Sequence, residues 1–326
     1  MSGPLILAIP SKGRLKEQVD GWLADCGLRA RPIGGARGYL AELEGLRGVQ
    51  VRLASAGDIA ASLAAGEIHL GVTGEDLLAE LRDAGGSQVT LLNALGFGRA
   101  DLVVAAPKSW IDVNTMSDVD DVAHAYLART GRRLRVATKY LVQSRAFFAR
   151  HGIADYRLVE SGGATEGAPA AGLTELIVDI TSTGDTLAAN GLKVLEDGVI
   201  LKSQAHLAAS PRADWDQASL AAARRLLSIV EARARGRSMA SLIWPAAQDA
   251  TARVAVAAFV EAGDAPRANG LLVRGSDLFA VTAALADAGV GPVSVTHPAY
   301  VFEAVSPAAD RLASAVAQGG GWIEPR

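Results

Sequence analysis

A segment of small polar residues with one glycine lies between a predicted strand and a predicted helix near the middle of the chain. The apolar run 176–178 indicates a buried strand that ends at Asp179, and residues 187–189 indicate the first turn of a helix. Backbone N–H groups at a helix start bind phosphate, because they point at the anion and the helix dipole favours negative charge. The residues that could complete such a site are Thr181, Ser182, Thr183, Gly184 and Thr186.

Asp179 is the residue of this segment that could bind a sugar. Its carboxylate could accept hydrogen bonds from ribose hydroxyls, directly or through Mg²⁺. Two interpretations stay open at this point. The segment is either a cradle for a phosphorylated sugar or an ordinary strand-to-helix turn capped by serine and threonine.

Two cations follow the first predicted strand, where a helix is expected to begin. Lys12 and Arg14 come directly after the strand 5–9. Ligands of α/β sheets bind beyond the carboxyl ends of the strands, so both side chains are placed for an anion. The alternative is a pair of solvated charges on a helical turn. By the same reasoning, Asp76 could be part of a helix cap and Glu166 part of a plain glycine-rich loop.

The composition of the chain excludes several classes of protein. Half of the 326 residues are hydrophobic, which is enough for two or three domains with their own cores. The net charge is −3, so no global field attracts nucleic acid or anionic membranes, and the local basic clusters 129–135 and 233–237 are typical of solvated helix ends. We therefore expect no nucleic-acid or membrane partner.

The cysteine and histidine content argues against disulfides and zinc. Cys26 is the only cysteine, so no disulfide can form within the chain, and no two histidines stand at the spacing of metal ligands. The first residues lack the basic and long apolar regions of a signal peptide. No apolar run is long enough to span a bilayer. These features lead us to expect a cytoplasmic protein.

Predicted strands and helices alternate along most of the chain, which favours an α/β fold with mostly parallel sheets. A long helix is expected over 214–235, followed by a linker at 236–238. From residue 239 the pattern is strand, helix, strand, helix, strand, which predicts a small α+β module. The predicted strands before it are 5–9, 49–53, 68–72, 101–106, 135–137, 157–160, 175–179, 192–195 and 199–207.

Five segments, taken together and in this order, resemble the ATP phosphoribosyltransferase family, the first enzyme of histidine biosynthesis. The resemblance covers about residues 5–235, and its most specific part runs from Glu166-Gly-Ala-Pro to Asp179-Ile-Thr-Ser-Thr-Gly-Asp-Thr-Leu and on to Leu192. The five segments are 7–15, 69–78, 95–107, 135–140 and 166–192.

The resemblance implies a fold like that of periplasmic binding proteins, with two doubly wound α/β domains around a cleft and a small C-terminal α+β domain. The expected boundaries are 1–106 with 196–237 for the first domain, 107–195 for the second, and 238–326 for the third. Long members of the family have such an ACT-like third domain, which binds histidine as a feedback inhibitor. Short members instead recruit a regulatory subunit like histidyl-tRNA synthetase. The resemblance also implies a homo-oligomer.

The resemblance further implies the reaction of ATP with phosphoribosyl pyrophosphate to give N1-(5-phosphoribosyl)-ATP and pyrophosphate, with Mg²⁺. By this likeness, residues 181–186, Asp185 included, hold the 5′-phosphate, and Asp179 and Glu166 face the ribose or its metal. No activated nucleophile is needed, because adenine N1 has a free lone pair, and the task is to position two polyanions. Residues expected toward ATP or the pyrophosphate are Lys12, Arg14, Arg52 and Asp76.

Three features depart from the family pattern. Asp185 places an acid inside the phosphate loop, where it should repel the phosphate unless its side chain points away. Leu141 follows Tyr140 where the family usually has proline. The stretch 54–58 is less basic than in the family, and Arg52 stands close enough to replace the missing cation. The alternative function is a non-catalytic module of the same fold that binds a small anion or regulates a partner.

Overall fold

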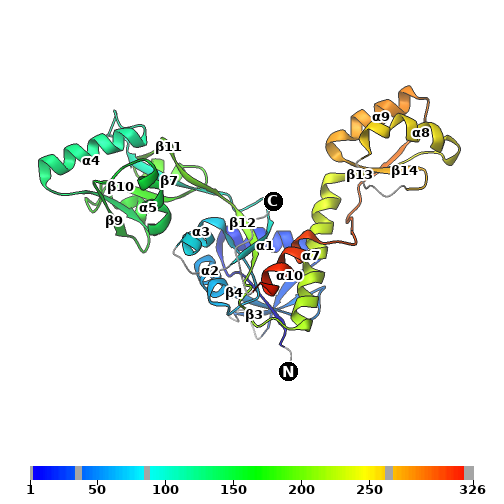
Figure 1. Ribbon diagram of the computed structural model, residues 1–326, viewed down its shortest axis with the longest axis horizontal. Helices are drawn as coiled ribbons and strands as arrows, with labels where there is room; N and C mark the ends of the chain where they lie inside the picture. The colour runs from blue at the N-terminus through cyan, green and yellow to red at the C-terminus, as the bar shows by residue number, and fades with distance from the viewer. Residues whose placement is uncertain (1–2, 34–38, 84–88, 261–266, 319–326) are drawn as a thin grey trace.

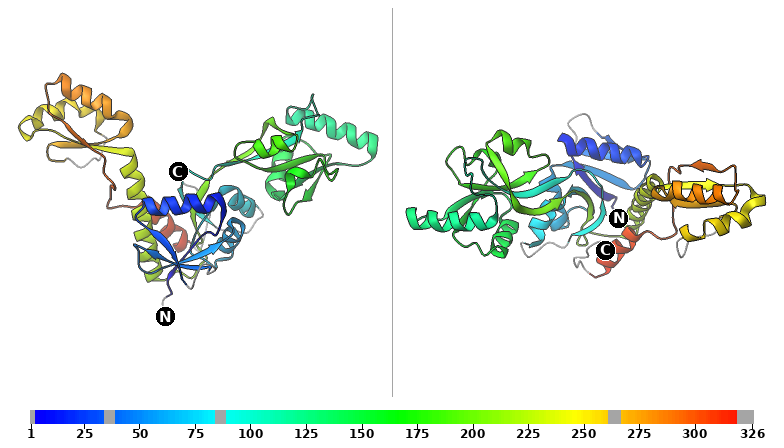
Figure 2. Two further views of the ribbon diagram at one scale, coloured as in Figure 1. Left: turned by 180° about the vertical axis from the view of Figure 1, so that it is seen from behind. Right: turned by 90° about the horizontal axis from the view of Figure 1, so that it is seen from above.

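The computed structural model describes residues 3–33, 39–83, 89–260 and 267–318, and these residues form three separate sheets (Figure 1). In this view the five-stranded sheet and the three-stranded sheet lie on opposite sides of the seven-stranded one, and the two further views agree (Figure 2). Among the described residues, no helix is both long and apolar enough to cross a membrane.

The first domain is built on the seven-stranded sheet, whose order is β2-β3-β4-β1-β5-β12-β6. Only the pairs β4–β1 and β1–β5 are parallel, and the remaining pairs of this sheet are antiparallel. The strands are β1 (Leu5–Pro10), β2 (Arg29–Pro32), β3 (Leu40–Glu44), β4 (Val49–Ala54), β5 (Leu70–Gly74), β6 (Thr90–Ala94) and β12 (Ala205–Ala209).

Helices cover both faces of this sheet, because alternate strand residues are apolar on each side. One face packs against α1, α7 and α10, and the other packs against α2 and α3. The helices are α1 (Gly13–Asp25), α2 (Ala56–Ala65), α3 (Glu75–Asp83), α7 (Gln217–Ser238) and α10 (Pro307–Ala317).

The second domain is built on the five-stranded sheet, of order β11-β7-β10-β8-β9. Its core joins the strands to α4 and α5. Strands β9, β8 and β10 are parallel, whereas β7 and β11 run antiparallel to their neighbours. The elements are β7 (Ala100–Pro107), β8 (Leu134–Thr138), β9 (Tyr156–Glu160), β10 (Leu176–Thr181), β11 (Leu192–Ser203), α4 (Met116–Thr130), α5 (Leu141–Arg150), α6 (Asp185–Ala189) and η1 (Thr165–Gly167).

The third domain is a small antiparallel sheet of order β14-β13-β15 that packs its core against α8 and α9. The expected α/β fold with a small C-terminal α+β domain is therefore confirmed, but parallel pairing is confined to part of each large sheet. The elements are β13 (Met239–Ile243), β14 (Gly270–Arg274), β15 (Ser294–Thr296), α8 (Asp249–Ala255), α9 (Leu278–Asp287), and the short η2 (Ala246–Gln248), η3 (Ala257–Phe259) and η4 (Gly275–Asp277).

The end of the chain does not stay in the third domain. Helix α10 returns to the first domain, where Ala308, Ala309 and Leu312 are part of the core that α1 and α7 cover. Glu231 of α7 fixes the start of α10, accepting hydrogen bonds from Ser306 Oγ (2.6 Å) and from the backbone N–H of Ala308 (2.9 Å). The stretch 238–326, expected as one domain, is therefore divided between the third domain and the first.

The predicted linker at 236–238 is wrong, because α7 continues through it to Ser238. The returning chain lies against the last two turns of α7, with the N–H of Val301 donating to the carbonyl of Ala232 (2.9 Å). A Cβ on Gly236 would lie 2.6 Å from the carbonyl oxygen of Ala299. The glycine that suggested a linker is there because two segments of backbone approach closely.

Candidate functional site

The polar segment of the second domain forms a tight loop between β10 and α6. Gly184 has a φ of +82°, which favours glycine, and its N–H donates to Thr181 Oγ1 at 2.9 Å. Helix α6 begins at Asp185, two residues earlier than predicted, and is five residues long. The loop is therefore a strand end, a turn closed by a threonine hydroxyl and a helix start, as the sequence indicates.

Asp185 is bound inside this loop. Its Oδ2 accepts a hydrogen bond from Thr183 Oγ1 at 2.8 Å, and both side chains are exposed. The carboxylate therefore points toward the Thr183 hydroxyl and not away from the loop. Because the Thr183 proton is donated to Asp185, it is not free to bind a phosphate oxygen in this conformation.

Asp179 lies in β10, two residues before its last residue Thr181, and is close enough to Glu166 of η1 for the two carboxylates to repel each other. Burial raises the pKa of the Asp179 carboxyl above its ordinary value, and the nearby negative charge of Glu166 adds to the rise. A hydrogen bond from the N–H of Ile180 (2.8 Å) and the positive charge of Lys139 oppose it. Thr165, which precedes Glu166, is buried and donates its hydroxyl to Ser161 Oγ at 2.9 Å. The charges of Glu166 and Lys139 thus both act on the Asp179 carboxyl.

Lys139 is a candidate that sequence reasoning missed as a site residue. It is exposed and follows β8 directly, and β8 pairs in parallel with β10. Its Nζ lies 4.9 Å from the ring centroid of Tyr140. The signal that could have found it is its place after a strand, since the carboxyl ends of neighbouring parallel strands share a sheet edge.

The loop lies at the end of the second sheet where the chain crosses between the first and second domains. Thr181 pairs with Asp101 at the start of β7, and Ala100 pairs with Ser203 at the end of β11. Both crossings between the sheets are thus adjacent to the loop, and β7 and β11 can be followed from the second sheet toward the first domain in Figure 1. This edge of the second sheet therefore faces the first domain.

Lys12 and Arg14 belong to the first domain and are exposed at the end of β1. Lys12 has extended backbone and occupies the N-cap position of α1, and its side chain makes no capping hydrogen bond. Among the described residues, no hydrogen bond or ion pair joins either cation to the loop of the second domain. Both remain available for an anion.

Asp76 lies in a buried hydrogen-bond network formed by the protein's own side chains. It is buried, its Oδ2 accepts from the hydroxyl of Tyr140 (2.5 Å), and its Oδ1 accepts from Ser203 Oγ (2.8 Å). Burial, the charge of Asp76 and this hydrogen bond raise the pKa of Tyr140 above its ordinary value, so the phenol keeps its proton. Both oxygens of the Asp76 carboxylate are therefore already hydrogen-bonded.

Arg52 lies apart from the strand ends that carry the other cations. It stands within β4, opposite Ala8, and lines a cavity of about 670 Å³ together with His69, Asp214 and Asp216. The less basic stretch beside it is a helix cap, in which Ser55 Oγ accepts from the N–H of Asp58 at 3.1 Å. The structure therefore does not support Arg52 as a replacement for the missing cation.

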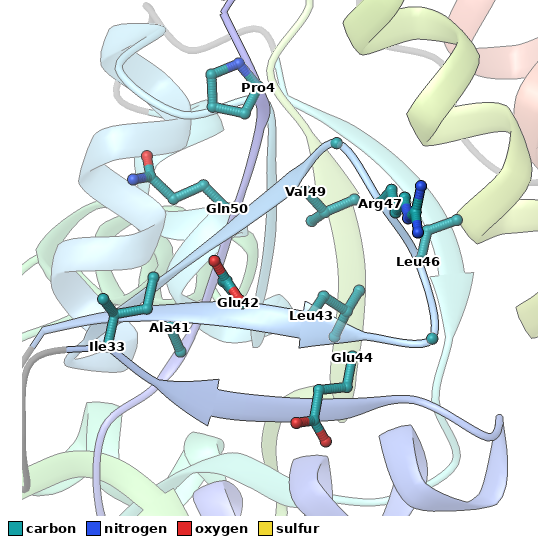
Figure 3. Close-up of a pocket in the computed structure, with 12 residues that line it drawn as sticks. Pro4, Ile33, Ala41, Glu42, Leu43, Glu44, Leu46, Arg47, Val49 and Gln50 are labelled. Atoms are coloured by element: carbon teal, nitrogen blue, oxygen red, sulfur yellow. The ribbon is translucent and has the colours of Figure 1, made fainter.

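A second cavity, of about 680 Å³, lies at the β3–β4 turn of the first domain. Its lining includes Ile33, Leu43 and Leu46, with the carboxylates of Glu42 and Glu44 on β3 (Figure 3). None of the candidate site residues lines it. It is next to the amino end of β4, whereas the candidate cations Lys12 and Arg14 follow the carboxyl end of the neighbouring parallel strand β1.

Comparison with known proteins supports the sequence resemblance. The sequence model of the ATP phosphoribosyltransferase (HisG) family matches residues 55–231. The ATP phosphoribosyltransferase of Caulobacter vibrioides strain NA1000 is 67% identical over 316 residues, which is 97% of this chain and 99% of that protein. That of Bradyrhizobium sp. strain ORS 278 is 57% identical over 235 residues, 72% of each chain.

Among solved structures, the ATP phosphoribosyl transferase (HisG:HisZ) complex from Thermotoga maritima is similar with a TM-score of 0.49 and 26% identity, over 64% of this chain and 88% of that chain. The two relatives named above match this chain over most of its length, and the family model covers more than half of it. The chain belongs to the ATP phosphoribosyltransferase family.

Proposed function

We propose that this chain transfers the 5-phosphoribosyl group of phosphoribosyl pyrophosphate to N1 of ATP and releases pyrophosphate, the first step of histidine biosynthesis. The observation that supports this most is the order of Asp179 in β10, the hydroxyl-rich turn after it and the start of α6, with the charge of Glu166 acting on Asp179. Family membership over nearly the whole chain supports the same reaction.

The loop from Thr181 to Thr186 holds the 5′-phosphate. Hydroxyl groups and the backbone N–H groups at the start of α6 donate to the phosphate oxygens, and Gly184 allows the backbone to come close. Asp179 and Glu166 accept hydrogen bonds from the ribose hydroxyls. The sugar is thereby fixed with its C1′ directed toward the first domain.

The chemical step breaks the bond from C1′ to the pyrophosphate oxygen and forms the bond from C1′ to adenine N1. The lone pair of N1 supplies the new bond, and the electron pair of the broken bond leaves with the pyrophosphate. Lys12, Arg14 and Lys139 stabilise the negative charge of the leaving group and of the ATP phosphates. The protein contributes alignment and charge stabilisation rather than a covalent nucleophile.

Asp179 and Glu166 are the residues that would hold Mg²⁺. The ion usually binds through one or two carboxylates together with substrate phosphates, so this pair fits it. In the described part of the chain, no group of three or more histidine, cysteine or acidic side chains could hold a metal ion alone. When bound, the ion would neutralise charge on the pyrophosphate.

We assign ATP to Lys12 and Arg14, and not to Asp76 or Arg52. Asp76 is buried with both carboxylate oxygens bonded, and Arg52 lines a separate cavity. We further propose a homo-oligomeric enzyme of the cytoplasm. Its third domain binds histidine as a feedback inhibitor, or the chain works with a regulatory subunit like histidyl-tRNA synthetase.

A direct assay tests the reaction. Purified protein is mixed with ATP, phosphoribosyl pyrophosphate and Mg²⁺, pyrophosphatase removes the pyrophosphate, and the product is followed by ultraviolet absorbance. Product formation is expected, and added histidine is expected to slow it. No product, with or without a regulatory subunit, would exclude the enzyme and leave the non-catalytic anion-binding module.

A further inference from the structure

Helix α3 of the first domain supplies the cap of helix α5 in the second. Tyr140 occupies the N-cap position of α5, but its side chain makes no capping hydrogen bond. The first N–H groups of α5 instead donate to Glu80 of α3, Val142 N–H to Oε1 at 2.8 Å and Gln143 N–H to Oε2 at 3.0 Å. A carboxylate at a helix start satisfies unpaired donors and favours the helix dipole. Helix α5 is therefore completed by another domain.

A buried hydrogen-bond network lies one helical turn earlier in α3. The Asp76 carboxylate binds the hydroxyls of Tyr140 and Ser203, and the Asp76 carbonyl accepts from Gln143 Nε2 at 2.9 Å. These four residues are all nine-tenths or more buried. The carboxylate folds back over Gly74, where any Cβ would collide with it. The network therefore joins α3, α5 and the crossing strand β11.

Apolar contacts join the two domains at the same place, which we call the junction: Glu80 and Asp76 of α3 with the start of α5 and Ser203 of β11. Leu77, between Asp76 and the next turn of α3, packs against the core of the second domain and also against the α2–α3 face of the first. Buried hydrogen bonds to a carboxylate are stronger than neutral ones and costly to leave unmade. The junction thus has both a polar and an apolar component, and it holds the two domains in one relative orientation.

Tyr140 connects this junction to the candidate site. It follows Lys139 in the chain, and the negative charges of both Asp76 and Asp179 raise the pKa of its hydroxyl. We propose that Tyr140, held by Asp76, is a positioning residue: it sets the second domain, and with it Asp179 and the phosphate loop, at the angle that aligns the sugar with ATP on Lys12 and Arg14. This inference rests on the proposed function, in which each domain binds one substrate.

The test is Tyr140→Phe, which removes only the hydroxyl, together with Glu80→Ala, which removes the cap of α5. In-line transfer between two domains is sensitive to small displacements, so kcat should fall about tenfold or more in both variants. The KM for each substrate should change little, because neither residue contacts a substrate. Tyr126→Phe is the matched control, since its hydroxyl donates to Glu175 at 3.0 Å within the second domain, and it should keep the parent kcat.

Domain orientation is measured without substrates, in a Cys26→Ala background with spin labels at Glu17→Cys on α1 and Asp121→Cys on α4, both exposed positions. The distance distribution should broaden with Tyr140→Phe and with Glu80→Ala, and not with Tyr126→Phe. An unchanged distribution in both junction variants would overturn the inference, as would a raised KM at unchanged kcat. A parent protein that makes no product would refute the proposed function alone, because the label distances would still report the junction.

Discussion

Thr183 donates its hydroxyl proton to Asp185, two residues further along the loop proposed to hold the phosphate, at 2.8 Å. The loop therefore contains an internal hydrogen bond that a bound phosphate would have to replace. It also contains a negative charge where the ligand is negative. Both effects oppose binding, and both depend on a single carboxylate.

We expect Asp185→Asn to tighten the binding of phosphoribosyl pyrophosphate. The substitution removes like-charge repulsion within a few ångströms and leaves a weaker partner for Thr183. The KM for this substrate should fall by about threefold to tenfold, with little change in the KM for ATP. Asp121→Asn, an exposed change on α4, serves as the control for a general loss of negative charge. A higher KM for phosphoribosyl pyrophosphate in Asp185→Asn would show that the acid helps to bind it.

Asp179→Asn should abolish activity and stabilise the ligand-free protein at neutral pH. Burial raises the folded-state pKa of Asp179 above its unfolded value, so the charged carboxylate costs stability at any pH above the folded-state pKa. The variant should therefore unfold at a higher temperature than the parent at pH 8. The difference should shrink as the pH falls through the folded-state pKa. Thermal unfolding at several pH values checks this, and equal melting temperatures at pH 8 would contradict it.

Lys139→Met should lower kcat/KM for phosphoribosyl pyrophosphate by about tenfold or more, because it removes a cation from the site. The positive charge of Lys139 lowers the pKa of Asp179, so its loss should also move the acidic limb of the pH–rate profile to higher pH. Lys108→Met, an exposed lysine after β7, is the control. A loss of activity without a shift of the acidic limb would show that Lys139 does not act on the pKa of Asp179.

The fold class could be predicted because its signals are local. Apolar runs such as 102–106 mark buried strands, and glycine marks the ends of helices, as at Gly66 and Gly131. The return of α10 could not be predicted, since its apolar face fits any core and only the assembled first domain shows which one it joins. The pairing of β12 between β5 and β6 is likewise a long-range choice.

The candidate site divides in the same way. Asp179 and the loop 181–186 are contiguous in sequence, so the strand, the turn and the helix start could be predicted from spacing, whereas their roles in binding a phosphorylated sugar rest on the resemblance and stay a prediction. The surroundings of Asp76 could not be predicted, because in the sequence a carboxylate after a strand looks the same whether it faces a ligand or a buried tyrosine. The place of Arg52 could not be predicted either, because its closeness in sequence to residues 54–58 does not indicate which cavity its side chain lines.

Glu231→Ala should weaken the attachment of α10. The carboxylate is 8% exposed and accepts hydrogen bonds from the start of α10, so its loss should cost about 2 kcal/mol of local stability. Glu303→Ala removes an exposed ion pair with Arg235 and should cost much less. Hydrogen exchange of residues 307–317 is the measurement. Protection equal to that of the parent in Glu231→Ala would mean that apolar packing alone holds the helix.

The third domain can be tested for histidine binding only if α10 is kept. Truncation at Arg237 would remove the third domain and α10 together, exposing the core residues that Leu312 covers, so lost inhibition would be confounded by an unstable first domain.

The backbone of Pro298 lies beside Gly236, with its carbonyl oxygen 2.8 Å from where a Cβ would stand. A short Gly-Ser linker can therefore join Ser238 to Pro298 in place of residues 239–297. We expect this internal deletion to stay folded and active and to lose inhibition by histidine, whereas truncation at Arg237 should aggregate or melt early. Inhibition that persists in the internal deletion would place the effector site outside the third domain.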